Sequence, residues 1–151
     1  MSYINKNGVE VIWERIKGLI NSVLTKYTSQ DSGWVNIPCE SGFKAYSSGQ
    51  TPQVKRQGVT VIVRGAFKPT ATVTDTSVWT TMGIIPDEYC PANSIYRTCQ
   101  GSGRAKWKMR ISEDGRVMLA NYGTGTTSSS ASTSAWLVLG NIEYRAKQKD
   151  I

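Results

Sequence analysis

Aromatic rings and cations are the side chains of this sequence that are best suited to chemistry. The chain has 151 residues, among them five tryptophans, seven tyrosines and 18 lysines or arginines. Aromatic rings offer large flat contact areas at a small entropic cost, and arginine forks donate hydrogen bonds to phosphate, carboxylate or hydroxyl oxygens. The sequence therefore has the means to bind a polyhydroxylated or anionic ligand at its surface.

Acid–base and metal chemistry has much weaker support. The sequence contains no histidine, which excludes nucleophilic triads of the usual kind and histidine-ligated metal sites. Glycan hydrolysis would need two carboxyl groups about 5 to 10 Å apart. Most acids outside the first third of the chain lie in expected turns, namely Asp75, Asp87, Glu88, Glu113 and Asp114. We expect no catalytic residue, no cofactor and no metal, and thus no enzyme.

The cysteines Cys39, Cys90 and Cys99 are odd in number, and their spacing matches neither a zinc site nor a redox motif. Free cysteines are commonly buried as small apolar groups. We therefore expect reduced thiols, with a bridge between Cys90 and Cys99 as the alternative. The first 27 residues are interrupted by charges, which indicates neither a signal peptide nor a membrane-inserted segment.

Residues 7–27 have the apolar spacing of a coiled-coil helix. Apolar side chains recur at heptad positions a and d, and position e is apolar as well, so the stripe is wide enough for three helices. Asn7 is the expected N-cap, with Glu10 three residues later. The residues expected to mediate trimerisation are Val9, Ile12, Trp13, Ile16, Leu19, Ile20 and Val23.

An alternative for the same helix is that it folds back onto its own domain. A helix of about 20 residues is marginal in water by itself, so it must pack either against that domain or against identical copies. We favour packing against identical copies. The polar stretch 28–33, which contains Gly33, then ends the helical pattern. The predicted organisation is a helical stalk at 1–28, a linker at 29–33 and a β head at 34–151.

Beyond the linker the apolar period changes from seven to two, which predicts an antiparallel β-sandwich or barrel of six to eight short strands. Within 104–112, Trp107 and its alternate neighbours face the core while the lysines face outward, and a turn at 113–115 makes a hairpin. Trp136 is also expected in the core, whereas 123–134 is expected to be a long mobile loop. The expected strands are 34–37, 42–46, 58–67, 79–85, 94–100, 104–112, 116–122 and 136–144.

This order of parts resembles the receptor-binding and tail-fibre proteins of phages that infect Gram-positive bacteria. Heads of that family often contain an apolar residue, Pro, two polar residues, Tyr, any residue and Pro, which here is Ile85-Pro86-Asp87-Glu88-Tyr89-Cys90-Pro91. The hairpin around Asp114-Gly115 and a last strand that opens with Trp136 are similar too. Cys90 stands where Arg is common in the family phrase, so no role of that Arg carries over.

The resemblance implies a homotrimeric, non-enzymatic adhesin at the tail tip or baseplate of a virion, made in the host cytoplasm. It implies host cell-wall polysaccharide or a teichoic-acid-like polymer as ligand, and other tail or baseplate proteins as partners. Because the hairpin and the segment 86–97 can meet at one end of a head, we place the saccharide-binding site at Tyr89, Tyr96, Arg97, Arg110 and Tyr122.

Two other functions stay open. One is a trimeric structural spike that binds no ligand. The other is nucleic-acid binding, suggested by the net charge of +7 and by the run 104–110. In a strand, however, Trp107 points away from the cations of that run, so rings and charges do not share one stacking platform. Anionic wall polymers account for the charge equally well.

Overall fold

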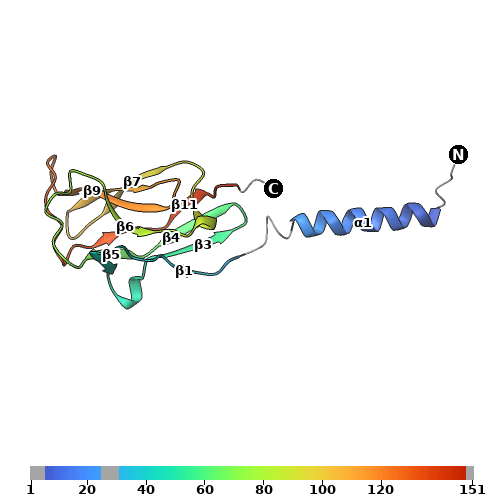
Figure 1. The fold of residues 1–151 in the computed structure, drawn as a ribbon, viewed down its shortest axis with the longest axis horizontal. Coiled ribbons are helices and arrows are strands. Elements are labelled where there is room, and N and C mark those ends of the chain that lie inside the picture. Colours follow the sequence, from blue (N-terminus) through green and yellow to red (C-terminus); the bar gives the residue numbers. More distant parts are fainter. Residues whose placement is uncertain (1–5, 25–30, 149–151) are drawn as a thin grey trace.

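The computed structural model describes residues 6–24 and 31–148, which form an N-terminal helix followed by a β-rich region (Figure 1). The prediction of a mainly β protein with one N-terminal helix is confirmed. Two short 3-10 helices, η2 (Ser48–Gln50) and η3 (Asp87–Tyr89), interrupt the strands. The elements are α1 (Lys6–Leu24), β1 (Val35–Asn36), β2 (Phe43–Ala45), β3 (Gln53–Gln57), β4 (Thr60–Arg64), β5 (Ala66–Pro69), β6 (Thr80–Ile84), β7 (Ile95–Gln100), β8 (Lys106–Ile111), β9 (Arg116–Gly123), β10 (Leu137–Val138) and β11 (Ile142–Arg145).

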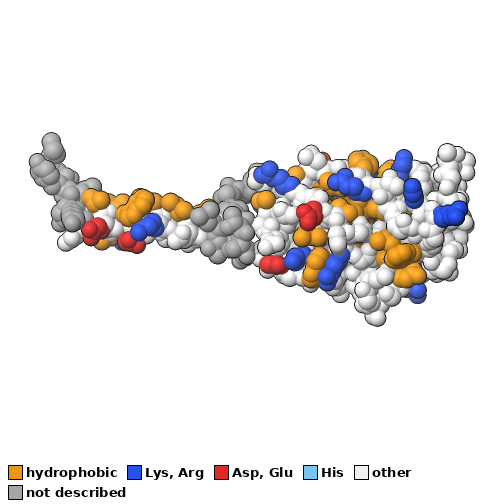
Figure 2. Space-filling view, turned by 180° about the vertical axis from the view of Figure 1, so that it is seen from behind, with side chains coloured by type: hydrophobic (Ala, Val, Ile, Leu, Met, Phe, Trp, Pro, Cys, Tyr) orange, Lys and Arg blue, Asp and Glu red, His pale blue; other side chains and the backbone are white. Residues whose placement is uncertain are grey.

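The apolar stripe of α1 is exposed. Its seam residues range from 40% exposed at Ile16 to 67% at Leu19, and Figure 2 shows hydrophobic side chains gathered mainly along one side of the helix. The structure thus gives no support to a helix packed on its own head. The predicted cap is wrong, because α1 begins at Lys6 and Asn7 lies inside its first turn. Predicted helical residues 25–27 lie outside the described part.

Three antiparallel sheets enclose the core of the head. Their strand orders are β1-β3-β4-β11, β10-β5-β2 and β6-β9-β8-β7. Side chains from all three sheets meet in one buried cluster, in which Phe67, Trp107 and Leu137 are almost completely inaccessible. As predicted, Trp107 and its alternate neighbours in β8 face inward, and β8 and β9 form a hairpin.

Two segments predicted as single strands bend at glycines. The segment 58–67 divides into β4 and β5 at Gly65, and 136–144 divides into β10 and β11 before and after Gly140, both glycines having positive φ. Because β4 pairs with β11 and β5 pairs with β10, this ladder stays paired while it passes from one sheet to the next. A Cβ at position 65 would overlap the Thr51 carbonyl, so only glycine fits this corner.

The loop 123–134, which was expected to be long and mobile, contributes a residue to the buried core. Ala131 is fully buried and pairs in a β-bridge with Val73. Thr76 adds a hydrogen bond from its hydroxyl to the Ser129 carbonyl. Strand β3, which was not expected from the sequence, pairs with β1 and β4. At the end of the predicted linker, Ser32 N donates to the Arg56 carbonyl. Within residues 6–24 and 31–148, no helix has the length and apolar character needed to span a bilayer.

Candidate functional site

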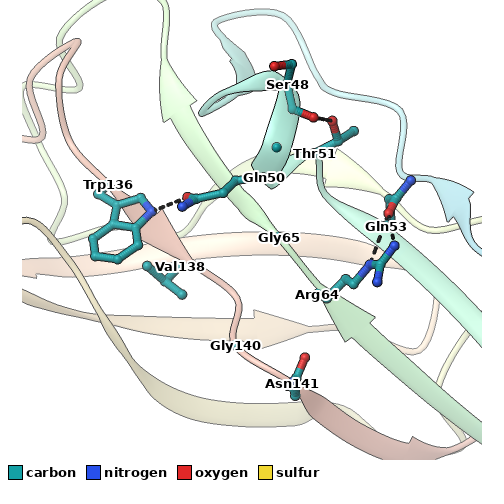
Figure 3. A pocket seen from close by; sticks show the side chains of 11 residues that line it. Ser48, Gln50, Thr51, Gln53, Arg64, Gly65, Trp136, Val138, Gly140 and Asn141 are labelled. Atoms are coloured by element: carbon teal, nitrogen blue, oxygen red, sulfur yellow. Dashed lines mark hydrogen bonds between the residues drawn. The ribbon is translucent and has the colours of Figure 1, made fainter.

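A pocket of about 480 Å³ lies where the bent ladder meets the η2 segment. Residues 48–53 form one wall and residues 136–141 another, with Arg64 and Gly65 from the corner of β4 between them. Figure 3 shows the Trp136 indole and the Arg64 guanidinium on opposite sides of the pocket. The volume falls within the range of about 300 to 1,000 Å³ that is usual for small-ligand sites.

Trp136 supplies the aromatic wall. Its indole Nε1 donates to Gln50 Oε1 over 2.7 Å, and its ring centroid lies 6.0 Å from that of Tyr46. Trp136 is only partly buried, so the prediction that it is a core residue is wrong. Trp136 alternates with the buried Ala135 and Leu137, so its side chain lies on the other face of the chain, at the pocket, where the ring is held in place and still accessible.

Arg64 supplies the charge. Its Nε and Nη2 donate to Gln53 Oε1 at 3.0 and 2.7 Å, and its guanidinium lies 3.7 Å from the Trp34 ring centroid. Stacking on an indole and a forked hydrogen bond together fix the plane of the group. Neither wall of the pocket contributes a carboxylate, and the described residues give Arg64 no ion-pair partner. The pocket therefore combines a flat ring, amide and hydroxyl groups, and one positive charge.

The structure does not bring the residues of the predicted saccharide site together on one accessible surface. Tyr89 and Tyr122 are buried, Tyr89 as part of η3 with its carbonyl bonded by the Tyr144 hydroxyl at 2.7 Å. Neither ring is presented to solvent. Tyr96 and Arg110 do meet, because they are register partners of β7 and β8, with the guanidinium 5.6 Å from the ring centroid. Arg97 is exposed and its guanidinium donates to the Tyr96 carbonyl at 2.8 Å, but as the register partner of Met109 it lies on the other face of β7.

Trp79 is the residue that sequence reasoning missed near that pair. It is 39% exposed, and its ring centroid lies 6.1 Å from that of Tyr96. The pocket residues Gln50 and Arg64 were missed as well. Their sequence signal was weak, because no local pattern tells which of 18 cations will be stacked on a ring or which polar loop will face a tryptophan across the fold.

The thiols and acids show no catalytic arrangement among the described residues. All three cysteines are free, although Cys39 is exposed and not buried as expected. Burial raises the pKa of the Cys99 thiol to about 11, so this thiol stays protonated near neutrality. The hydrogen bond from the Ser112 hydroxyl lowers the pKa of Asp114, whose carboxylate also pairs with Arg116 in the hairpin turn. No group of three or more metal-binding side chains occurs in the described ranges.

No protein-family model matches the sequence, and a comparison with curated proteins finds no significant match. Solved structures that are similar in fold include two phage proteins. The receptor binding protein of Listeria phage PSA superposes with a TM-score of 0.59 and 14% identity, over 97% of this chain and 83% of that one. The head domain of lactococcal phage bIL170, described within a common fold for receptor binding domains, gives 0.54 and 14% over 75% and 96%. This chain therefore has the fold of receptor-binding proteins from phages of Gram-positive hosts.

Proposed function

We propose that this protein is a phage receptor-binding protein that holds a saccharide of the host envelope in the pocket between Trp136 and Arg64. The observation that carries the proposal is the pocket itself, where an accessible indole stands across from an immobilised guanidinium. A sugar ring packs its C–H face on such an indole while its hydroxyls accept from fixed donors. The mechanism is adhesion, with no bond made or broken, and the shared fold supports it.

The proposed assembly is a homotrimer. Each α1 exposes an apolar stripe formed by Val9, Ile12, Trp13, Ile16, Leu19, Ile20 and Val23, and three stripes can bury one another along a common axis. In this proposal residues 1–28 are the stalk, 29–33 the linker and 34–151 the head. Three heads fixed on one axis raise avidity over single-site affinity by roughly 10² to 10⁴. Weak individual pockets then suffice for attachment.

The same proposal gives the protein a place at the tail tip or baseplate of a virion after synthesis in the host cytoplasm. Other tail or baseplate proteins are its structural partners. Cell-wall polysaccharide or a teichoic-acid-like polymer is its ligand. A structural spike without a ligand is the second candidate, and it is favoured by the exposed stripe of α1 alone, since that stripe accounts for assembly but not for the pocket.

Binding of the full chain to purified neutral host-wall saccharides tests the pocket. Trp136→Ala should weaken binding about tenfold, a loss of about 1.4 kcal/mol, which is typical of one aromatic contact. Trp136→Phe keeps a ring but removes the hydrogen bond to Gln50, and should have a smaller effect. Circular dichroism checks that both variants are folded.

Tyr96→Ala is the matched comparison, because Tyr96 is an exposed ring of the other candidate surface. Loss of saccharide binding in Tyr96→Ala, with none in Trp136→Ala, would move the receptor site away from the pocket. Failure of the wild-type chain to bind any wall preparation would favour the structural spike.

A further inference from the structure

The charged side chains of the sheet β6-β9-β8-β7 are all positive. Its four strands contain no aspartate or glutamate, but they carry Arg97, Lys106, Lys108, Arg110 and Arg116. Of these, Arg116 is paired with Asp114, which lies in the adjoining turn. The remaining cations have no ion-pair partner among the described residues. A sheet with this composition repels other cations and attracts anions.

Three of these cations form a row along β8. In β8 the side chains of Trp107, Met109 and Ile111 are buried, so Lys106, Lys108 and Arg110 share the outer face. Residues two apart in a strand are separated by about 6.8 Å. Anionic groups that repeat along an extended polymer at a similar interval can therefore contact successive side chains of the row. A span of this size separates phosphodiesters joined by a single glycerol unit.

Aromatic rings lie beside one end of the row. Tyr96 is opposite Arg110 in the β7–β8 register, is 56% exposed, and meets the edge of the Trp79 ring at 62°. Thr98 and Gln100 stand opposite Lys108 and Lys106, so the neighbouring strand offers neutral hydrogen-bonding groups along the rest of the row. Tyr96 and Trp79 thus lie on the same face as the cations, although Trp107, the aromatic residue of β8, points into the core.

We infer that the outer face of β7 and β8 is a second binding surface, which takes a linear polyanion with phosphodiester or carboxylate groups along Lys106, Lys108 and Arg110. The inference extends the proposed function without using the pocket at Trp136. A sugar unit of the polymer packs at Tyr96 and Trp79. An envelope polymer fits better than a single-stranded nucleic acid, because two rings inclined at 62° cannot stack a continuous series of bases.

The test compares the double variant K106Q/K108Q with K44Q/K147Q in the full chain. Both remove two exposed lysines, but Lys44 lies on β2 and Lys147 follows β11. The probes are poly(glycerol phosphate), polygalacturonate, dextran and an oligothymidylate. For K106Q/K108Q, affinity for the preferred polyanion should fall at least tenfold, and the slope of log K against log salt should fall by about two. K44Q/K147Q should change both by much less.

K106Q/K108Q should bind the neutral wall saccharide as the wild type does, and Trp136→Ala should bind the polyanion as the wild type does. The pocket and the β7–β8 face are thus tested independently. A preference for phosphate or for carboxylate polymer supports the inference in either case. Equal losses in the two double variants, or no loss in either, would overturn it. Tighter binding of the oligothymidylate than of both polyanions would also overturn it, in favour of nucleic acid.

Discussion

The helix α1 and the β head differ in how far their apolar side chains are buried. In the head, Phe67, Trp107 and Leu137 are at most 1% exposed and pack in one cluster. In α1 every apolar seam residue is at least 40% exposed. The head therefore contains the partners that its apolar side chains need, whereas the described residues offer none to the seam of α1. In the proposed trimer, two further helices supply those partners. This contrast is what the proposed division into a binding head and an assembly helix rests on.

The largest expected effect comes from a charge placed in the stripe of α1. Ile16→Asp puts a carboxylate at the centre of the proposed three-helix seam, where burial of an unpaired charge is prohibitive. We expect the solution mass to drop from about three times 16.6 kDa to that of one chain. Attachment to host walls should fall roughly 10²- to 10⁴-fold as avidity is lost.

Asn21→Asp is the control for that variant, since it adds the same charge on the opposite side of the helix, at heptad position f. It should assemble like the wild type. Light scattering that gives equal masses for the wild type and Ile16→Asp would contradict the proposed stalk.

The next largest effect should come from the head core. Trp107 is almost fully buried, and its indole donates to the Gln100 carbonyl at 2.8 Å. Trp107→Ala should lower the free energy of unfolding by about 3 to 5 kcal/mol. Urea unfolding in the Ile16→Asp background measures this without a contribution from assembly. Val78→Ala, at an exposed site, should stay within about 0.5 kcal/mol.

A smaller loss is expected at the corner of the ladder. Gly65 has φ +98°, and an added Cβ would meet the Thr51 carbonyl, so Gly65→Ala should cost about 1 to 3 kcal/mol. Gly49 in the neighbouring η2 has open space around it, and Gly49→Ala is the matched control. Similar urea midpoints for the two variants would show that the corner tolerates a side chain.

The smallest effect concerns the thiols of the head. Cys39 is exposed, Cys90 is buried, and the Cys99 thiol has its pKa raised to about 11. Because only the thiolate reacts, iodoacetamide at pH 8 should modify Cys39 first, and Cys99 should gain reactivity as the pH approaches 11. Peptide mass spectrometry follows each site, and all three should react alike in urea. Modification of Cys99 as fast as Cys39 at pH 8 would indicate a more open head.

The predicted strands succeeded where side chains alternate and failed where the chain turns a corner. The alternation around Trp107 was enough to assign β8, its inner face and the hairpin that follows. The segments 58–67 and 136–144 also alternate, but their glycines bend them into different sheets. Trp136 is outside the core because it alternates with the buried Ala135 and Leu137, which places its ring at the pocket. Tyr89 and Tyr122 were predicted to bind the ligand, but both are buried because the neighbouring elements cover them.

The sequence by itself determined the periodicities, and with them the amphipathic helix, the β head, and the separation of lysines from Trp107 in β8. These are local properties, set by 3.6 or two residues per repeat. Only the tertiary structure decided which rings stay accessible and which cations find a partner. Arg64 meets Trp34, and Tyr96 meets Trp79 and Arg110, across distances in sequence that no local repeat spans. Such contacts depend on sheet order and register, which are properties of the complete fold and not of any local segment.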